Sequence, residues 1–341
     1  MASQHTIKVG IIGAGRMGNL HAGHLAYRIP NATLAAIADL NPQKALKTAE
    51  AFHIPRATED YREILDDASI DGVLICSNTD SHTFLIKEAA SAGKHIFCEK
   101  PIDVNLESIA AALQAVEDAG VKLQVGFNRR FDANFQSIKK KIAADKIGQP
   151  HIIRITSRDP EPPPFEYLPT SGGLFLDMSI HDFDMACFLL QNEVVELYAT
   201  GDVLVDSRFK EANDIDTAVV TLKFSSGAIG VIDNSRKAVY GYDQRVEVFG
   251  SKGLIQVSNN TPDNHVLMTS ERVESSKPLY FFRERYKESF IAEIQAFVNA
   301  ILNDTEPLIS GKDSVTPVSI ALGANRSLFE NRPVKMSEMM S

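Results

Sequence analysis

Short apolar runs separated by helical patterns recur through the first 130 residues of the chain. The apolar runs lie at residues 9–12, 34–38, 73–76, 95–98 and 123–127. They are continuous rather than alternating, which is typical of strands that are buried on both faces of a parallel sheet. Helical patterns lie between them at residues 19–28, 43–52, 61–65, 83–92 and 106–119, and residues 54–57 are predicted to be a simple connection. This alternation predicts an α/β Rossmann domain, a doubly wound parallel sheet, over residues 1–127.

The pattern changes after residue 128. A helix is predicted at residues 134–144, and the strands that follow alternate in polarity, at residues 152–156, 194–199, 217–224, 228–234, 245–249 and 254–257. Such alternation is typical of a mostly antiparallel sheet with one covered face. Two helices, at about 286–302 and 314–328, complete a predicted α+β domain over residues 128–341, with a large open sheet. An open sheet face of this size is commonly covered by another subunit, so we expect an oligomer.

Three glycines join the first predicted strand to the first predicted helix. Gly13, Gly15 and Gly18 form a G-x-G-x-x-G fingerprint in the strand–turn–helix context that dinucleotide binding requires. Gly13 permits the tight turn, Gly15 lets the backbone approach a pyrophosphate, and Gly18 lets the helix lie close to the sheet. The phosphates would then lie at the helix N-terminus, where backbone N–H groups favour anions.

An acidic residue closes the second predicted strand. Asp39 lies 21 residues after Gly18, where a carboxylate can accept hydrogen bonds from the adenosine ribose and repel a 2′-phosphate. This favours NAD over NADP. Arg16, with Met17 beside it, is expected near the pyrophosphate, although an arginine here can also meet a 2′-phosphate. The alternative is a purely structural glycine turn, with Asp39 only starting a turn or capping the next helix. Because strand, glycines, helix, strand and acid are all in register, dinucleotide binding is favoured.

Polar residues follow the third and fourth of these apolar runs. Ser77, Asn78 and His82 come after residues 73–76, and Glu99 and Lys100 come after residues 95–98. In an open parallel sheet, ligands lie at the carboxyl ends of the strands. We therefore expect all five side chains at the nicotinamide end of the cofactor site. Most lysines are solvated surface residues, so a catalytic role for Lys100 depends on this strand-end position.

A histidine and an aspartate lie four residues apart in the second half of the chain. If residues 174–190 form one helix, Asp177 and His181 share a face. A histidine kept basic by a carboxylate can accept the proton that an alcohol loses when its hydride is removed. The alternative is an exposed helix pair, which contributes about 0.2–0.5 kcal/mol and has no chemical role.

Composition narrows the class of protein. The chain has 341 residues and a net charge of −9, and it has no Lys/Arg run long enough to follow nucleic-acid phosphates. It has no apolar segment of membrane-spanning length, and its N-terminus lacks the apolar region of a secretory signal. The three cysteines are expected to be reduced and buried, which favours a cytoplasmic protein. Because H-E-x-x-H and Cys/His clusters are missing from the sequence, no metal is expected.

Several of these motifs together resemble the Gfo/Idh/MocA oxidoreductase family. They are the N-terminal GIIGAGRMG, Glu99-Lys100-Pro101 and Asp177-x-x-x-His181, and the resemblance covers essentially the whole chain. Residues 126–131, 157–160, 172–184 and 242–250 resemble more narrowly the family members that oxidise inositols. The resemblance implies a Rossmann domain, an α+β domain whose sheet forms a homotetramer, and an active site between the domains.

The resemblance also implies roles for individual residues. Lys100 would contact the reacting hydroxyl and the nicotinamide, Asp177 would hold the substrate and the histidine, and His181 would be the general base. Arg129 and Tyr242 would bind the hydroxyls of a ring. Asp159 lies at a substrate-contact position where related enzymes commonly carry asparagine.

The expected reaction is NAD-dependent oxidation of myo-inositol at one axial carbon to 2-keto-myo-inositol. A polyol carries no charge, so selectivity must come from hydrogen bonds whose loss leaves buried polar groups unpaired. The nearest alternative is the same chemistry on scyllo-inositol or on an aldose such as glucose. An alternative of another class is a regulator that binds NAD(H) and has kept the fold without the reaction.

Overall fold

The computed structural model of the protein describes residues 6–339, and the chain forms two compact units. Unit 1 comprises Met1–Asn128 and Glu288–Val315, and unit 2 comprises Arg129–Lys287 and Thr316–Ser341. The division near residue 128 coincides with the expected boundary between 127 and 128. Residues 288–315 were expected in the second domain, but they belong to unit 1. The reason is that Ile294, Phe297 and Val298 are fully buried in the same hydrophobic core as the first strands.

Unit 1 is built on a six-stranded parallel sheet, sheet A, with the order β3-β2-β1-β4-β5-β6. Its strands are β1 (Ile7–Ile12), β2 (Ala32–Ala38), β3 (Arg56–Thr58), β4 (Gly72–Ile75), β5 (His95–Cys98) and β6 (Leu123–Val125). Residues 54–57, expected to be only a connection, contribute to β3, because Arg56–Thr58 pair in parallel with Ala36–Ala38 of β2. The strand order reverses between β1 and β4. That reversal is where ligands bind in open parallel sheets.

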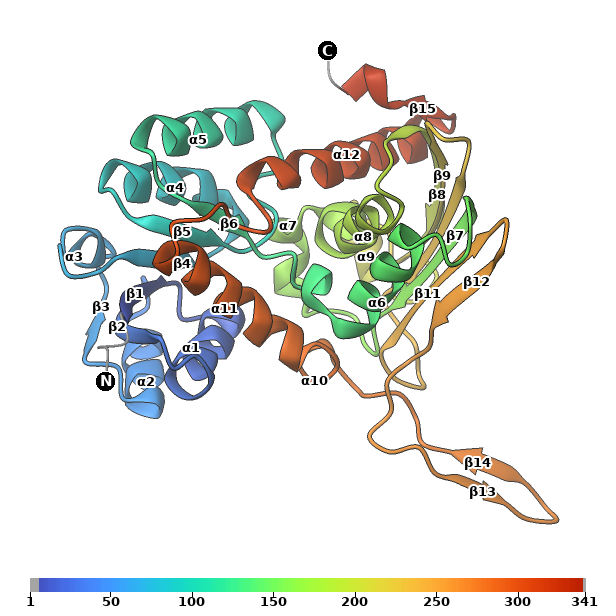
Figure 1. Cartoon of the computed structure of the whole chain (residues 1–341), viewed down its shortest axis with the longest axis horizontal. Coiled ribbons are helices and arrows are strands. Elements are labelled where there is room, and N and C mark those ends of the chain that lie inside the picture. Colours follow the sequence, from blue (N-terminus) through green and yellow to red (C-terminus); the bar gives the residue numbers. More distant parts are fainter. Residues whose placement is uncertain (1–5, 340–341) are drawn as a thin grey trace. The chain divides into compact units, whose positions relative to one another are not determined.

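Helices cover both faces of sheet A. They are α1 (Arg16–Arg28), α2 (Pro42–Phe52), α3 (Arg62–Leu65), α4 (His82–Ser91), α5 (Leu106–Ala119) and α11 (Lys287–Leu302). Helices α4 and α5 pack together on one face, while α1, α2 and α11 share the core on the other face (Figure 1). The predicted doubly wound Rossmann fold is confirmed.

Unit 2 contains a seven-stranded sheet, sheet B, with the order β12-β11-β7-β10-β9-β8-β15. Its strands are β7 (Pro150–Arg158), β8 (Val194–Asp202), β9 (Thr217–Phe224), β10 (Ile229–Ser235), β11 (Asp243–Gly250), β12 (Gly253–Val257) and β15 (Val334–Lys335). Every neighbouring pair is antiparallel except β7 with β10. The predicted mostly antiparallel sheet is therefore confirmed.

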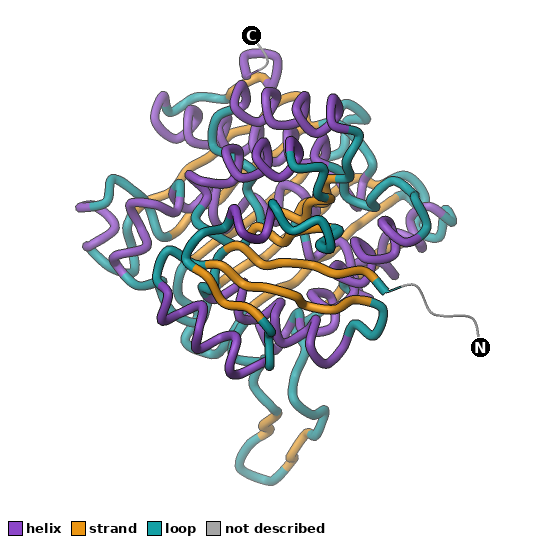
Figure 2. Tube along the Cα trace, turned by 90° about the vertical axis from the view of Figure 1, so that its left-hand side faces the viewer, coloured by secondary structure: helices purple, strands orange, loops and turns teal. Residues whose placement is uncertain are grey.

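One face of sheet B is covered by helices of the same unit (Figure 1). The helices of unit 2 are α6 (Ala133–Ala143), α7 (Leu168–Ser171), α8 (Ile180–Leu190), α9 (Arg208–Glu211), α10 (Phe282–Arg285) and α12 (Val315–Glu330), whose first residue belongs to unit 1. Residues of β9 alternate between buried and exposed, as expected for a sheet covered on one side. A hairpin, β13 (Val266–Met268) with β14 (Val273–Ser275), extends from this unit with all six strand residues exposed (Figure 2). Across residues 6–339, no helix has the length and apolar character needed to cross a bilayer.

Candidate active site

The turn between β1 and α1 gives each of its glycines a different environment. Gly13 has φ +103°, and a Cβ there would lie 2.7 Å from the backbone of Cys76. A Cβ on Gly18 would lie 1.8 Å from the carbonyl oxygen of Gly13. A Cβ on Gly15, by contrast, would meet no atom of residues 6–339 within 4 Å beyond its own chain neighbours, so its backbone is open to a ligand. Close packing therefore requires glycine at 13 and 18, and the opening at Gly15 fits the approach of a pyrophosphate.

Asp39 links the end of β2 to this turn. Its Oδ2 accepts a hydrogen bond from the backbone N–H of Ala14 at 2.7 Å, and its Oδ1 accepts from that of Asn41 at 2.8 Å. Asn41 caps α2, since its side chain accepts from the N–H of Gln43. Asp39 is therefore not the cap of the following helix. A carboxylate has about four acceptor sites, so two remain for ribose hydroxyls.

The two residues between the glycines differ in exposure. Arg16 is the first residue of α1 and its side chain is exposed, which suits a contact with phosphate. Met17 is half-buried and packs against the hydrophobic core of unit 1. Its side chain is thus part of that core.

The loops after β4 and β5 are joined by a histidine. His82 is buried, with Nδ1 2.8 Å from the carbonyl oxygen of Pro101 and Nε2 3.1 Å from that of Ser77. Burial lowers the pKa of His82, which favours the neutral imidazole. Ser77 Oγ lies 2.6 Å from Ser81 Oγ, and Asn78 is exposed. His82 thus contacts the backbone of both loops at the sheet edge where the cofactor residues were predicted.

Glu99 and Lys100 directly follow β5 and lie in different environments. Glu99 is buried and accepts a hydrogen bond from His21 Nε2 of α1 at 2.7 Å. Lys100, the next residue, is half-exposed. The backbone of the loop therefore places one side chain in the interior of unit 1 and leaves the next one accessible.

In unit 2, Arg129 lies in a buried polar cluster. Its Nη1 donates to Asp182 Oδ1 at 2.6 Å, and its guanidinium carbon lies 5.4 Å from the ring centre of Tyr286. The rings of Tyr286 and Tyr242 are 6.1 Å apart and nearly perpendicular. Burial raises the pKa of both tyrosines, so both phenols are neutral near neutral pH. Asn234 donates to Asp182 Oδ2 at 2.8 Å, which completes the pairing of that carboxylate.

A second arginine, Arg236, connects two of the predicted site residues. Its Nη1 lies 2.9 Å from Asp177 Oδ2 and 3.5 Å from Asp159 Oδ2, and the side chain is only 3% exposed. Tyr167 donates its hydroxyl to Asp177 Oδ1 at 2.9 Å. Burial raises the pKa of Asp159, and the nearby charge of Asp177 raises it further, whereas Arg236 lowers it. Arg236 therefore supplies the positive charge that allows two acids to lie close together.

The sequence patterns did not identify Arg236, Tyr167 or Asn234. Asn234 is the last but one residue of β10 and Arg236 directly follows this strand, so both are near a strand end, as Lys100 is in unit 1. Tyr167 lies in the loop after β7, where no periodicity marks it. A position near a strand end is therefore the only feature of the sequence that marks Arg236 and Asn234.

The segment that carries Asp177 and His181 is not one α-helix as expected. Residues Phe175–Ser179 form a π-helical turn, and α8 begins at Ile180. A π-turn closes its hydrogen bonds over five residues instead of four, so the simple i, i+4 spacing does not apply across it. Such turns occur frequently at functional sites. His181 is half-buried at the first turn of α8.

A parallel Rossmann sheet with an open glycine turn gives unit 1 the features of a dinucleotide-binding domain. Residues 7–127 match the family model described as an oxidoreductase family with an NAD-binding Rossmann fold. Residues 135–256 match the GFO/IDH/MocA C-terminal domain. The chain belongs to the Gfo/Idh/MocA family and is an NAD-dependent dehydrogenase.

Relatives match over nearly the whole chain. An uncharacterised oxidoreductase of Bacillus subtilis is 50% identical over 330 residues, which are 97% of this chain and 96% of the relative. A myo-inositol 2-dehydrogenase of Thermotoga maritima is 45% identical over 335 residues, 98% of this chain and 100% of the relative. A solved scyllo-inositol dehydrogenase of Lactobacillus casei, with NAD(H) and scyllo-inositol bound, is 30% identical. Its TM-score is 0.90, and the match covers 97% of this chain and 99% of that one. The predicted family and NAD cofactor are confirmed.

Proposed function

We propose that this protein oxidises myo-inositol at one axial carbon to 2-keto-myo-inositol (scyllo-inosose), with NAD as the hydride acceptor. The observation that carries the proposal is the 45% identity, over nearly the full length of both chains, to a myo-inositol 2-dehydrogenase. The polar side chains of unit 2 support it, because an uncharged ring of hydroxyls is selected by paired hydrogen bonds. Arg129, Asp159, Asp177, His181 and Tyr242, with Lys100 of unit 1, are the proposed substrate-binding residues.

We assign the proton transfer to His181. NAD, when bound, accepts a hydride from the carbon that carries the reacting hydroxyl. The imidazole of His181 accepts the proton of that hydroxyl, Asp177 orients the imidazole, and Lys100 donates a hydrogen bond to the same oxygen. Arg236 and Tyr167 contact the two oxygens of Asp177 and thereby hold this carboxylate in a fixed orientation.

The proposed NAD site follows the edge of sheet A. The backbone around Gly13, Gly15 and Gly18 receives the pyrophosphate, with Arg16 and Met17 at the start of α1, and Asp39 accepts from the adenosine ribose. Ser77 and Asn78 lie toward the nicotinamide. His82 and Glu99 support the loops that carry Ser77 and Lys100.

Initial rates with myo-inositol, scyllo-inositol and glucose, each with NAD and with NADP, test the proposal. We expect the highest kcat/KM for myo-inositol with NAD. A higher kcat/KM for scyllo-inositol would favour the second candidate, since a scyllo-inositol 2-dehydrogenase (NAD(+)) of Bacillus subtilis is 34% identical to this chain. The absence of turnover with every polyol, together with tight NADH binding, would favour a regulator instead.

We also propose that the protein is a homotetramer assembled through the uncovered face of sheet B. Val219, Ile229, Phe249 and Leu254 are 41–50% exposed and come from four strands of that sheet. Pairing such faces between copies would remove this apolar surface from water. Light scattering on the purified protein should give four times the chain mass of 37.4 kDa. A monomer at micromolar concentration would contradict the proposal.

The thiols suggest where the protein works. Cys76 and Cys98 are buried free thiols, and burial raises the pKa of both. Free thiols persist in reducing compartments, so we propose a cytoplasmic location. Finding the protein in an oxidising compartment by fractionation would contradict this assignment.

A further inference from the structure

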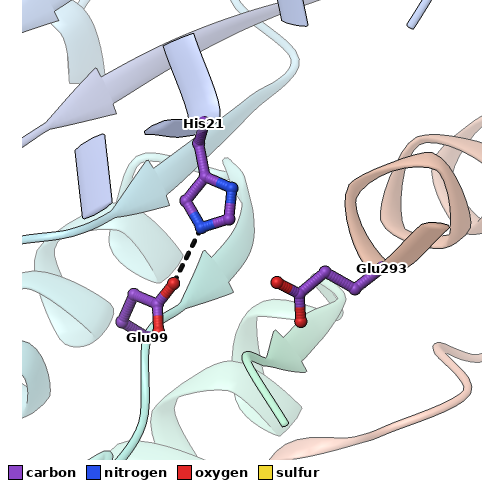
Figure 3. Close-up of side chains that lie close together, drawn as sticks. All are labelled: His21, Glu99 and Glu293. Atoms are coloured by element: carbon purple, nitrogen blue, oxygen red, sulfur yellow. Dashed lines mark hydrogen bonds and ion pairs between the residues drawn. The ribbon is translucent and has the colours of Figure 1, made fainter. Parts of the chain in front are cut away.

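Three ionisable side chains meet in the interior of unit 1. They are His21 of α1, Glu99 directly after β5 and Glu293 of α11 (Figure 3). Their exposed fractions are 0%, 8% and 0%. One ligand-type atom from each lies within 4.8 Å of those of the other two. The segments that bring them together are far apart in the sequence. One member of the cluster, Glu99, directly precedes Lys100 in the sequence.

The contacts within the cluster are unequal. His21 Nε2 lies 2.7 Å from Glu99 Oε1, a buried hydrogen bond, whereas neither carboxyl oxygen of Glu293 has a hydrogen-bond partner within residues 6–339. Burial and the nearby Glu99 raise the pKa of Glu293 well above its ordinary value. Burial and the charge of Glu99 therefore both disfavour the ionised form of Glu293, whereas Glu99 accepts the hydrogen bond of His21.

On the other side of Lys100, the carbonyl of Pro101 is held by His82. A neutral imidazole carries one N–H and both partners are carbonyl oxygens, so only one of the two contacts is a hydrogen bond; the 2.8 Å from Nδ1 to Pro101, against 3.1 Å from Nε2 to Ser77, favours Nδ1 as the donor. The backbone of Lys100 thus lies between two buried contacts, each made by a histidine from a different helix. Both contacts lie within unit 1.

We propose that His21 and His82 are positioning residues for Lys100, acting through the side chain of Glu99 and the carbonyl of Pro101, with Glu293 enclosing the first contact. The inference rests on the proposed function, because Lys100 has a task only in that reaction. A lysine side chain is long and flexible, so the place of its ammonium depends on how firmly its backbone is held. A displacement of about 1 Å at a reacting group can lower the rate about 100-fold.

A divalent cation bound by the same three residues would be a different site. Histidine with two carboxylates can bind zinc, but each group must then direct a lone pair at the ion. In this cluster the Nε2–H of His21 is directed at Glu99 itself, and a metal would require Glu293 to be ionised. The geometry favours the positioning role, and the two roles predict opposite results for Glu293→Gln.

Substituting each of the two histidines by glutamine and, separately, by asparagine tests the proposal. The amide nitrogen of glutamine reaches the place of a histidine Nε2, and that of asparagine reaches the place of Nδ1. We expect His21→Gln to keep kcat within about fivefold and His21→Asn to lower it by about 10- to 100-fold. At the second contact the order is reversed, with His82→Asn active and His82→Gln impaired.

Steady-state kinetics and NADH titration separate positioning from general damage. In the impaired variants kcat should fall while the Kd for NADH, read from the fluorescence of the dinucleotide, stays within about threefold. Ser314→Ala, which removes another buried hydrogen bond of unit 1, to the carbonyl of Gly311, is the matched control and should leave kcat unchanged. Glu293→Gln should remain active, with no metal bound to the wild type.

Three results would overturn the inference. They are equal kcat for the asparagine and glutamine variants at both positions, a loss of kcat in the Ser314→Ala control equal to theirs, or stoichiometric divalent metal whose loss in Glu293→Gln abolishes activity. Lack of turnover by the wild type would instead contradict the proposed function. The two failures are therefore distinguishable.

Discussion

Removing Arg236 should destabilise unit 2 because it takes away the positive charge that forms an ion pair with both Asp177 and Asp159. Arg236→Met keeps most of the side-chain length but removes the group that lies 2.9 Å from Asp177 and 3.5 Å from Asp159. Breaking a buried ion pair costs about 3–5 kcal/mol. We expect about 3 kcal/mol, the lower end, because the Asp177 and Asp159 side chains retain 14% and 21% exposure.

The loss should depend on pH. Burial and Asp177 already raise the pKa of Asp159 in the folded protein, and removing Arg236 raises it further. A carboxyl whose folded pKa exceeds its unfolded value of about 3.9 binds more protons when folded, so stability falls as pH rises toward the folded pKa. The variant should therefore be less impaired at pH 5 than at pH 8.

A double-mutant cycle identifies the cause. Asp159→Asn in the Arg236→Met background removes one uncompensated acid and should recover about 1–2 kcal/mol, whereas Asp159→Asn alone should be destabilising or neutral. The chain has no tryptophan, so urea unfolding is best followed by circular dichroism, at both pH values. Strictly additive effects, within about 0.5 kcal/mol, would refute the argument that Arg236 compensates Asp159.

Three further outcomes are expected. His181→Ala should lower kcat by about 10²- to 10⁴-fold while NADH binding in a fluorescence titration is nearly unchanged; comparable turnover would remove His181 from the mechanism. Asp39→Ser should weaken NAD binding and lower the ratio of kcat/KM with NAD to kcat/KM with NADP, because a 2′-phosphate would no longer meet a carboxylate. An unchanged ratio would contradict this role of Asp39. Glu293→Gln should be more stable than the wild type in urea, by a margin that grows from pH 5 to pH 8, because the raised pKa of Glu293 makes the folded protein lose stability as pH rises; a margin that does not change with pH would contradict the raised pKa.

The fold of unit 1 can be predicted from the sequence because the patterns that indicate it each lie within a short segment. Continuous apolar strands, the three glycines and Asp39 all lie within short segments whose geometry follows from their own residues. The apolar face of α11 is equally visible in the sequence, but nothing local says which core it covers. The π-turn before α8 is also not visible, because one inserted residue barely changes the apolar pattern.

The polar contacts of the site were harder to predict. His21 and Glu99 are 78 residues apart, and a pairing over such a distance depends on the finished fold. Ligands lie at the carboxyl ends of parallel strands, which predicts Lys100, whereas Arg236 follows a strand of a mostly antiparallel sheet, for which the rule gives no expectation. The residue types needed for polyol chemistry could be recognised, whereas the groups that hold them in place could not.

The return of the chain to unit 1 affects how the protein can be made. A ribosome releases β1 through β6 long before α11, so the growing chain must complete most of unit 2 before Ile294, Phe297 and Val298 can fill the space beside Val9 and Leu34. Until then the face of sheet A that α11 covers is exposed to water, and Glu99 lacks one of its buried neighbours. A fragment that ends at residue 128 would keep this exposed surface permanently, and chaperones would be its natural partners.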